Sequence, residues 1–151
     1  MPMSTPPPHA ELVDALRGRG MRVTPQRLLI HDALERIGRH ATADDVLRRV
    51  RAQQPGLSLP TVYATLDLLV ELGAARRVNA ATGAALYDPR TDPHAHLVCE
   101  RCGAVEDVEL ELELDEAALL ERARRAGTLA DAAEIVLRGR CRACAAALSA
   151  A

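Results

Sequence analysis

Four cysteines stand in two closely spaced pairs, Cys99-x-x-Cys102 and Cys141-x-x-Cys144. Two thiolates separated by two residues can grip one metal ion, and two such pairs complete the tetrahedron of four sulfurs that is typical of structural zinc. Such a site has no open coordination position, so it stabilises the fold and catalyses nothing. A redox dithiol or two disulfides would be the alternative. The N-terminus lacks the pattern of a secretory signal, so we expect a cytoplasmic protein, in which paired cysteines favour zinc.

A second set of possible metal ligands begins at His94 and His96, which are two residues apart and therefore point to one face of an extended chain. Imidazole and carboxylate ligands without sulfur suit Fe(II), Mn(II) or Zn(II). The spacing alone does not select the remaining ligands of this second ion. The candidates are Asp88, Asp92, Glu106, Asp107 and His40.

The composition describes a globular chain whose two parts differ in charge. Of the 151 residues 48% are hydrophobic and 26% charged, and neither Phe, Trp nor Lys occurs, so Leu, Val, Ile and Ala must build the core. Up to Tyr87 there are 11 Arg against 8 acidic residues, and beyond it 8 Arg against 13 acidic residues. The basic first part suits nucleic acid, and the acidic second part suits cations or a protein partner. No apolar run approaches the roughly 20 residues that would span a bilayer.

The first part has the pattern of a helical DNA-binding domain. We expect a helix over residues 10–17, and three more helices whose N-caps are Thr24, Thr42 and Ser58. The third and fourth helices read as a helix-turn-helix. Residues 75–79 and 84–87 flank a Thr82-Gly83 turn, which predicts a β-hairpin. A hairpin directly after a helix-turn-helix is the winged-helix arrangement.

The second part predicts a small α/β unit. We expect strands at 96–99, 104–108 and 134–138, with an alternating apolar pattern over 108–114, and a helix over 115–126 that Gly127 ends. The fold class is therefore α+β. We expect a disordered tail at 1–9, a winged-helix domain at 10–87, and a metal-binding dimerisation domain at 88–151.

With these residues identified, the chain resembles the ferric uptake regulator family from about residue 13 to residue 144. The matching segments are GMRVTPQR (20–27), HATADDV (40–46), LPTVYATLDLLVELG (59–73), ALYDPRTDPHAHLVCERCG (85–103) and GRCRAC (139–144). The resemblance implies a homodimeric repressor that binds a double-stranded DNA operator and is not an enzyme. It implies structural zinc on the four cysteines and a regulatory Fe(II) or Mn(II) ion at the junction of the two domains. The regulatory ligands that it implies are His40, Asp88, His94, His96 and Asp107.

Within the family, Asp rather than Glu at position 107 resembles the peroxide-responsive branch. In that branch bound Fe(II) reacts with hydrogen peroxide and a ligand histidine is oxidised, which here implies His40 or His94. Asp88 in place of a cysteine argues against the zinc-uptake branch. The alternative is an iron- or manganese-responsive repressor of metal homeostasis genes. A histidine that some relatives carry shortly before the last cysteine pair is missing, which weighs against an additional metal site.

We expect DNA contacts from the fourth helix, from the arginines before and within the second helix, and from the hairpin. The candidates are Thr61, Tyr63, Arg17, Arg19, Arg22, Arg27, Arg76 and Arg77. Tyr63 could instead be partly buried against the hairpin, and Ala64 replaces a polar or basic residue that is common in the family. A metalloenzyme is disfavoured because no HExxH motif or nucleophile elbow is present. A zinc-stabilised interaction module without DNA binding is disfavoured by the basic first part.

Overall fold

The computed structural model describes residues 9–80, 82–109 and 115–150, and these form two compact units. The first unit comprises the described residues up to Asn79 together with Ala84–Thr91, and the second comprises Ala80–Gly83 and the described residues from Asp92 onward. The sequence predicted a boundary after Tyr87, whereas this division falls after Thr91. The predicted tail at 1–9 lies outside the described residues except for His9, which precedes the first helix.

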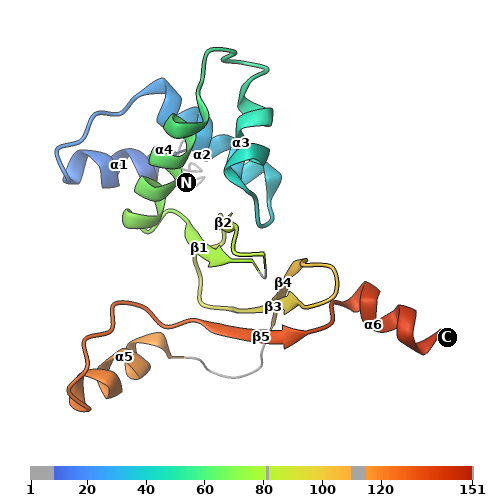
Figure 1. Cartoon of the computed structure of the whole chain (residues 1–151). Coiled ribbons are helices and arrows are strands. Elements are labelled where there is room, and N and C mark those ends of the chain that lie inside the picture. Colours follow the sequence, from blue (N-terminus) through green and yellow to red (C-terminus); the bar gives the residue numbers. More distant parts are fainter. Residues whose placement is uncertain (1–8, 81, 110–114, 151) are drawn as a thin grey trace, which may run out of the picture. The chain divides into compact units, whose positions relative to one another are not determined.

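The first unit begins with four helices, which Figure 1 labels α1 to α4. They are α1 (Ala10–Gly18), α2 (Pro25–Ile37), α3 (Ala43–Val50) and α4 (Leu59–Glu71). The side chains of Thr24 and Ser58 accept hydrogen bonds from backbone N–H groups in the first turns of α2 and α4. Thr42 forms a reciprocal capping box with Asp45 at the start of α3. The three predicted N-caps are therefore confirmed, because each side chain satisfies an N–H group that has no partner within its helix.

Aliphatic side chains from all four helices fill one core. Leu16, Ile30, Leu34, Val46 and Leu66 are completely buried, and each stabilises the fold by about 1.5–3 kcal/mol through loss of contact with water. Tyr87 is the one aromatic residue in the buried part of this cluster. The core of the first unit is thus almost entirely aliphatic, as the absence of phenylalanine and tryptophan predicted.

A two-stranded hairpin follows α4 and completes the winged-helix arrangement. Its strands are β1 (Arg76–Asn79) and β2 (Ala85–Asp88), which pair antiparallel with Arg77 opposite Tyr87. The other edge of β2 meets the segment before α3, where Tyr87 and Ala41 exchange two backbone hydrogen bonds of 2.8 and 2.9 Å. The strand that ends in Asp88 is therefore fixed on both sides.

The second unit is built on a three-stranded sheet of order β4-β3-β5. The strands are β3 (Ala95–Cys99), β4 (Val105–Val108) and β5 (Ile135–Gly139), with β4 antiparallel and β5 parallel to β3. Asp115 caps α5 (Glu116–Arg125), and Cys141 caps α6 (Arg142–Ser149). The predicted α+β class is confirmed. The predicted alternation over 108–114 lies largely outside the described residues, and α6 was not predicted.

Several apolar side chains of the second unit remain exposed. Neither α5 nor α6, both fully described, contains a buried residue. Leu129 is 95% exposed, and Leu119, Val136, Leu137 and Leu148 are also exposed. Among the described residues, no helix combines the length and the apolar character that crossing a membrane would require.

Candidate metal centres and nucleic-acid interface

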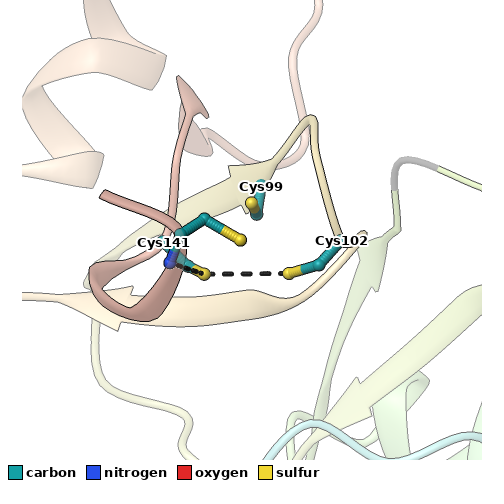
Figure 2. A group of neighbouring side chains, drawn as sticks. Cys99, Cys102 and Cys141 are labelled. Carbon is teal, nitrogen blue, oxygen red and sulfur yellow. Dashed lines mark hydrogen bonds between the residues drawn. The ribbon is translucent and has the colours of Figure 1, made fainter. Parts of the chain in front are cut away.

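The parallel pairing of β3 with β5 brings the two cysteine pairs of the second unit together. Cys99 ends β3 and lies opposite Gly139, the last residue of β5, while Cys141 follows two residues later and caps α6. The Sγ atoms of the four cysteines lie within 4.8 Å of one another, and those of Cys102 and Cys141 are 3.7 Å apart. Figure 2 shows the sulfurs of Cys99, Cys102 and Cys141 directed toward a common point.

This cluster fits a tetrahedral metal ion. Zinc–sulfur bonds of about 2.3 Å place neighbouring sulfurs about 3.8 Å apart, close to the observed Cys102–Cys141 distance. Backbone N–H groups of Cys141 and Cys102 lower the pKa of the Cys99 thiol to about 6. A hydrogen bond to the Cys141 sulfur raises the pKa of Cys144 to about 12. Full ligation by four thiolates must therefore release protons, as zinc binding to cysteines does.

A second set of ligand atoms lies elsewhere in the second unit, where β3 and β4 pair. His96 and Asp107 are direct cross-strand partners, and His94 lies two residues earlier on the same face. Asp107 Oδ1 is 3.2 Å from His94 Nε2 and 3.7 Å from His96 Nε2. Both histidines are buried, and their ring centroids are 4.4 Å apart. One carboxylate oxygen thus faces two imidazole nitrogens.

Neighbouring groups set which nitrogen of each ring faces Asp107. His94 Nδ1 is 2.7 Å from the Asp92 carbonyl oxygen, and because a carbonyl can only accept, Nδ1 carries the proton. The lone pair is then on Nε2, the atom that faces Asp107. His96 Nδ1 lies 3.7 Å from Glu134 Oε1, just before β5. Such outer groups orient metal-binding histidines, and no pattern in the sequence indicated that Glu134 would lie here.

The first unit holds another histidine–carboxylate pair. His40 Nε2 lies 3.3 Å from Asp88 Oδ2, and both side chains are less than a tenth exposed. The Ala41–Tyr87 bridge explains this contact, because His40 precedes Ala41 and Asp88 follows Tyr87 on antiparallel segments. The other oxygen, Asp88 Oδ1, accepts a hydrogen bond of 2.9 Å from the Arg90 N–H group. This network aims one carboxylate oxygen and one imidazole nitrogen at the same place.

Both histidine–carboxylate sets fit part of a coordination sphere. Metal–ligand bonds of about 2.1 Å separate adjacent ligand atoms by about 3.0–3.4 Å, which is close to the shorter distances found within each unit. Of the other two candidates, Glu106 lies within reach of the Arg142 N–H group at the start of α6, at 3.4 Å. Asp92 offers its backbone carbonyl to His94. Neither carboxylate is among the clustered ligand atoms of the two sets.

The predicted DNA contacts fall partly on one surface of the first unit. Thr61 and Arg27 line a groove of about 450 Å³ between the first turns of α2 and α4, and Ala64 lines it as well. Tyr63 is 40% exposed on α4, an exposure compatible both with a DNA contact and with partial burial against the hairpin. The positive ends of two helix dipoles at this groove favour phosphate oxygens.

The predicted arginines make several contacts within the first unit. Arg19 donates to the Glu71 carbonyl at the C-terminal end of α4, at 2.9 Å. Arg27 donates to the Arg22 carbonyl, and Arg76 to the Thr91 carbonyl. Arg77 pairs with Asp67, while Arg17 is exposed in the last turn of α1. Arg19 thus supports the far end of α4, whereas Arg27 lies beside its first turn.

Sequence reasoning missed a contact between the hairpin and α4. The buried Tyr87 hydroxyl donates a hydrogen bond of 2.7 Å to Asp67 Oδ1. Burial, together with this hydrogen bond, raises the pKa of Tyr87 to about 12. A signal was present in the sequence, because Tyr87 is one of two aromatic residues and its hydroxyl requires a partner when buried.

Comparison with known proteins matches this chain to one family. The model of the ferric uptake regulator family matches residues 18–129. The ferric uptake regulation protein of Bacillus subtilis is 38% identical over 112 residues, which are 71% of this chain and 75% of that protein. The peroxide operon regulator of the same organism is 33% identical over 97 residues, 64% of this chain and 67% of that one.

Solved structures give the same result. The ferric uptake regulator of Pseudomonas aeruginosa with manganese is 28% identical, with a TM-score of 0.67, and the match covers 88% of this chain and 98% of that one. Relatives named for iron uptake and for peroxide response are both similar to this chain. The comparisons therefore support the family as a whole and not the peroxide-responsive branch in particular.

Proposed function

Because this chain belongs to the ferric uptake regulator family of metal-dependent DNA-binding transcriptional regulators, we propose that it is a homodimeric repressor controlled by one regulatory metal ion per chain. In this proposal residues 10–87 read the operator, and residues 88–151 bind metal and pair with a second chain. The observation that carries it is the presence of a partial ligand set in each unit: His40 with Asp88, and His94 with His96 and Asp107.

One ion that took ligands from both sets would fix the orientation of the reading domain on the pairing domain. Two such domains in a dimer must match half-sites that lie about 34–36 Å apart, one helical turn of DNA. A change from mostly mismatched to mostly matched orientation requires a difference in metal affinity of roughly 10⁴, or about 5.5 kcal/mol. Metal affinity and operator affinity are then linked reciprocally.

The four cysteines would hold a separate zinc ion that stabilises the pairing domain. Their spacing, their convergence and the acidic pKa of Cys99 support this role. The homodimer is supported by apolar side chains of the second unit that have no cover in a single chain, above all Leu129 and Leu148. Burial of such side chains between two copies would stabilise the dimer.

DNA binding would involve α4, the groove beside its first turn, and basic side chains around it. Thr61 and Tyr63 lie on α4 and are the candidates for base or phosphate contact. Arg17, Arg22 and Arg27 suit phosphate contact near α2, and Arg76 and Arg77 suit it on the hairpin. Phosphate contacts govern affinity more than sequence preference. Arg19 would act indirectly, by holding the C-terminal end of α4.

The finer proposal is that the repressor senses peroxide through oxidation of a ligand histidine. It is supported by Asp at position 107, which resembles the peroxide-responsive branch. In net terms a ring C–H of His40 or His94 would become C–OH while hydrogen peroxide is reduced to water. Fe(II) would supply the redox chemistry when bound, and Mn(II) would not. The oxidised ring is a poorer ligand, so repression would end. A regulator of iron or manganese homeostasis without this step is the alternative.

A gel-shift titration with an operator fragment tests both levels. We expect tight binding with Mn(II) or Fe(II), and release by a chelator. If peroxide is sensed, the Fe(II) protein leaves the operator after peroxide and the Mn(II) protein stays, and mass spectrometry finds one added oxygen on the peptide with His40 or His94. Retention of the Fe(II) protein with unmodified histidines would favour the homeostasis alternative. Operator binding that ignores the chelator would contradict the proposed function itself.

A further inference from the structure

Tyr87 connects a proposed metal-binding pair to the helix that is proposed to read DNA. Its backbone is hydrogen-bonded to that of Ala41, and these two residues are the chain neighbours of Asp88 and His40. Its side-chain hydroxyl donates a hydrogen bond to Asp67 of α4. We propose that the hydrogen bond from Tyr87 to Asp67 is a positioning contact that transmits metal occupancy at His40 and Asp88 to the placement of α4. This inference rests on the proposed function and names a residue through which that function is regulated.

The backbone side of the connection is tight. Tyr87 N–H donates to the Ala41 carbonyl at 2.8 Å, and Ala41 N–H donates to the Tyr87 carbonyl at 2.9 Å. One planar peptide joins Tyr87 to Asp88, and another joins His40 to Ala41, so neither ligand can move far without moving this bridge. An ion that draws the His40 and Asp88 side chains into one geometry therefore acts directly on the position of Tyr87.

The side-chain end of the connection meets α4 at a single carboxylate. Asp67 Oδ1 is 2.7 Å from the Tyr87 hydroxyl and 3.8 Å from Arg77 Nη1. Arg77 and Tyr87 are direct cross-strand partners, so both strands of the hairpin reach the same oxygen. The carboxylate thus ties the hairpin to the helix.

The position of Asp67 on α4 makes the contact relevant to DNA reading. Asp67 lies four residues after Tyr63, so the two share one face of the helix, and Tyr63 is exposed toward solvent. A helix of this length moves as a rigid body, so a displacement of Asp67 also displaces Tyr63 and Thr61. Tyr87 is almost completely buried, at 1% exposure, so its ring cannot swing away into solvent.

The test compares operator affinity with saturating Mn(II) and with a chelator, for the unmodified full chain, four single variants and one double variant. Tyr87→Phe keeps the buried ring and removes the hydroxyl. Asp67→Leu removes the acceptor, whereas Asp67→Asn keeps an acceptor oxygen for the hydroxyl. Asp32→Asn is the matched control, because Asp32 is a helical carboxylate that pairs with Arg36 of the same helix and has no part in the proposed sites.

We expect the ratio of metal-bound to metal-free operator affinity to fall about tenfold in Tyr87→Phe and Asp67→Leu, as loss of a hydrogen bond to a charged group implies. Asp67→Asn and Asp32→Asn should keep the ratio. The double variant Tyr87→Phe/Asp67→Leu should lose no more than either single variant. By reciprocity, operator DNA should raise Mn(II) affinity less in Tyr87→Phe by the same factor, and this readout does not depend on stability.

Each remaining outcome decides against one idea. If Mn(II) does not change the operator affinity of the unmodified chain, the proposed function itself is wrong. The coupling through Tyr87 then has no basis either. If the unmodified chain responds and Tyr87→Phe responds equally, the coupling is wrong. Equal weakening of both affinities in Tyr87→Phe also overturns it, because the contact is then merely structural. If Tyr87→Phe does not fold, the comparison of Asp67→Leu with Asp67→Asn decides.

Discussion

His40 and Asp88 face each other across a bridge between two segments that are distant in the sequence, with Nε2 and Oδ2 3.3 Å apart. Both side chains are less than a tenth exposed, so the pair is held by the fold and not by chance contact at the surface. Its relation to metal control can be tested directly.

His40→Ala should abolish the effect of Mn(II) on operator affinity while the chain remains folded. Loss of one ligand should lower the affinity for the regulatory ion by more than tenfold, since even outer groups around a metal ligand contribute about 10–100-fold to metal affinity. The measurement is operator affinity over a range of Mn(II) concentrations. His31→Ala is the matched control, because His31 lies in the same unit and pairs with Glu35 instead. Equal metal dependence of both variants would remove His40 from the site.

Cys102→Ser should remove one zinc ion per chain and destabilise the second unit. Structural zinc contributes about 10–16 kcal/mol of binding free energy in small zinc domains, so its loss cannot be offset by the few buried side chains of this unit. Metal analysis together with thermal unfolding provides the measurement. Ala143→Ser is the control, because it adds a hydroxyl between Cys141 and Cys144 without removing a ligand. Retention of a full zinc ion by Cys102→Ser would contradict the four-sulfur site.

Local signals in the sequence predicted much of this fold. Thr24, Thr42 and Ser58 marked helix starts correctly because an N-cap acts within three residues of itself. The α6 helix was missed because the alanine-rich segment after Cys144 has no apolar periodicity, and its cap is a cysteine that was interpreted only as a metal ligand.

The site was predictable only in part. The spacing of His94 and His96 indicated a shared face, and the register of β3 with β4 adds Asp107 to it. The contacts of Glu134 and of Asp67 depend on pairings between distant segments, which no local pattern encodes. For this reason the family resemblance, and not spacing, selected His40 and Asp88 among the candidates.

Glu134→Gln should weaken the binding of the regulatory metal without unfolding the chain. The Glu134 carboxylate faces His96 Nδ1 and favours the ring form whose Nε2 lone pair is directed at Asp107. We expect Mn(II) affinity to fall by about tenfold, the lower end of the range for such outer groups. Glu121→Gln serves as the comparison, since Glu121 pairs only with Arg125 in the contacts described on α5. Unchanged Mn(II) affinity in Glu134→Gln would exclude an orienting role.

Acidification should destabilise the first unit through His31. Burial, aided by the nearby His9, lowers the pKa of His31 below its ordinary value of 6.5. Because the unfolded chain then binds the proton more readily than the folded one, this contribution to stability is present above pH 6.5 and is lost as the pH falls below it. Urea unfolding at pH 7.5 and 5.5 should show a smaller loss in His31→Gln than in the unmodified chain. An identical loss in both would mean that other groups cause the acid sensitivity.

β3 carries His96 and Cys99 only three residues apart, so two chemically different centres share one short stretch of backbone. A strong chelator would remove zinc from the four cysteines, and an oxidant of thiols would destroy its ligands. Either treatment should loosen β3, the strand that also positions the His96 imidazole. We therefore expect that a newly made chain needs the proposed zinc ion before it can respond to the regulatory ion. Zinc starvation would then abolish the response to the regulatory metal, however abundant that regulatory metal is in the cell.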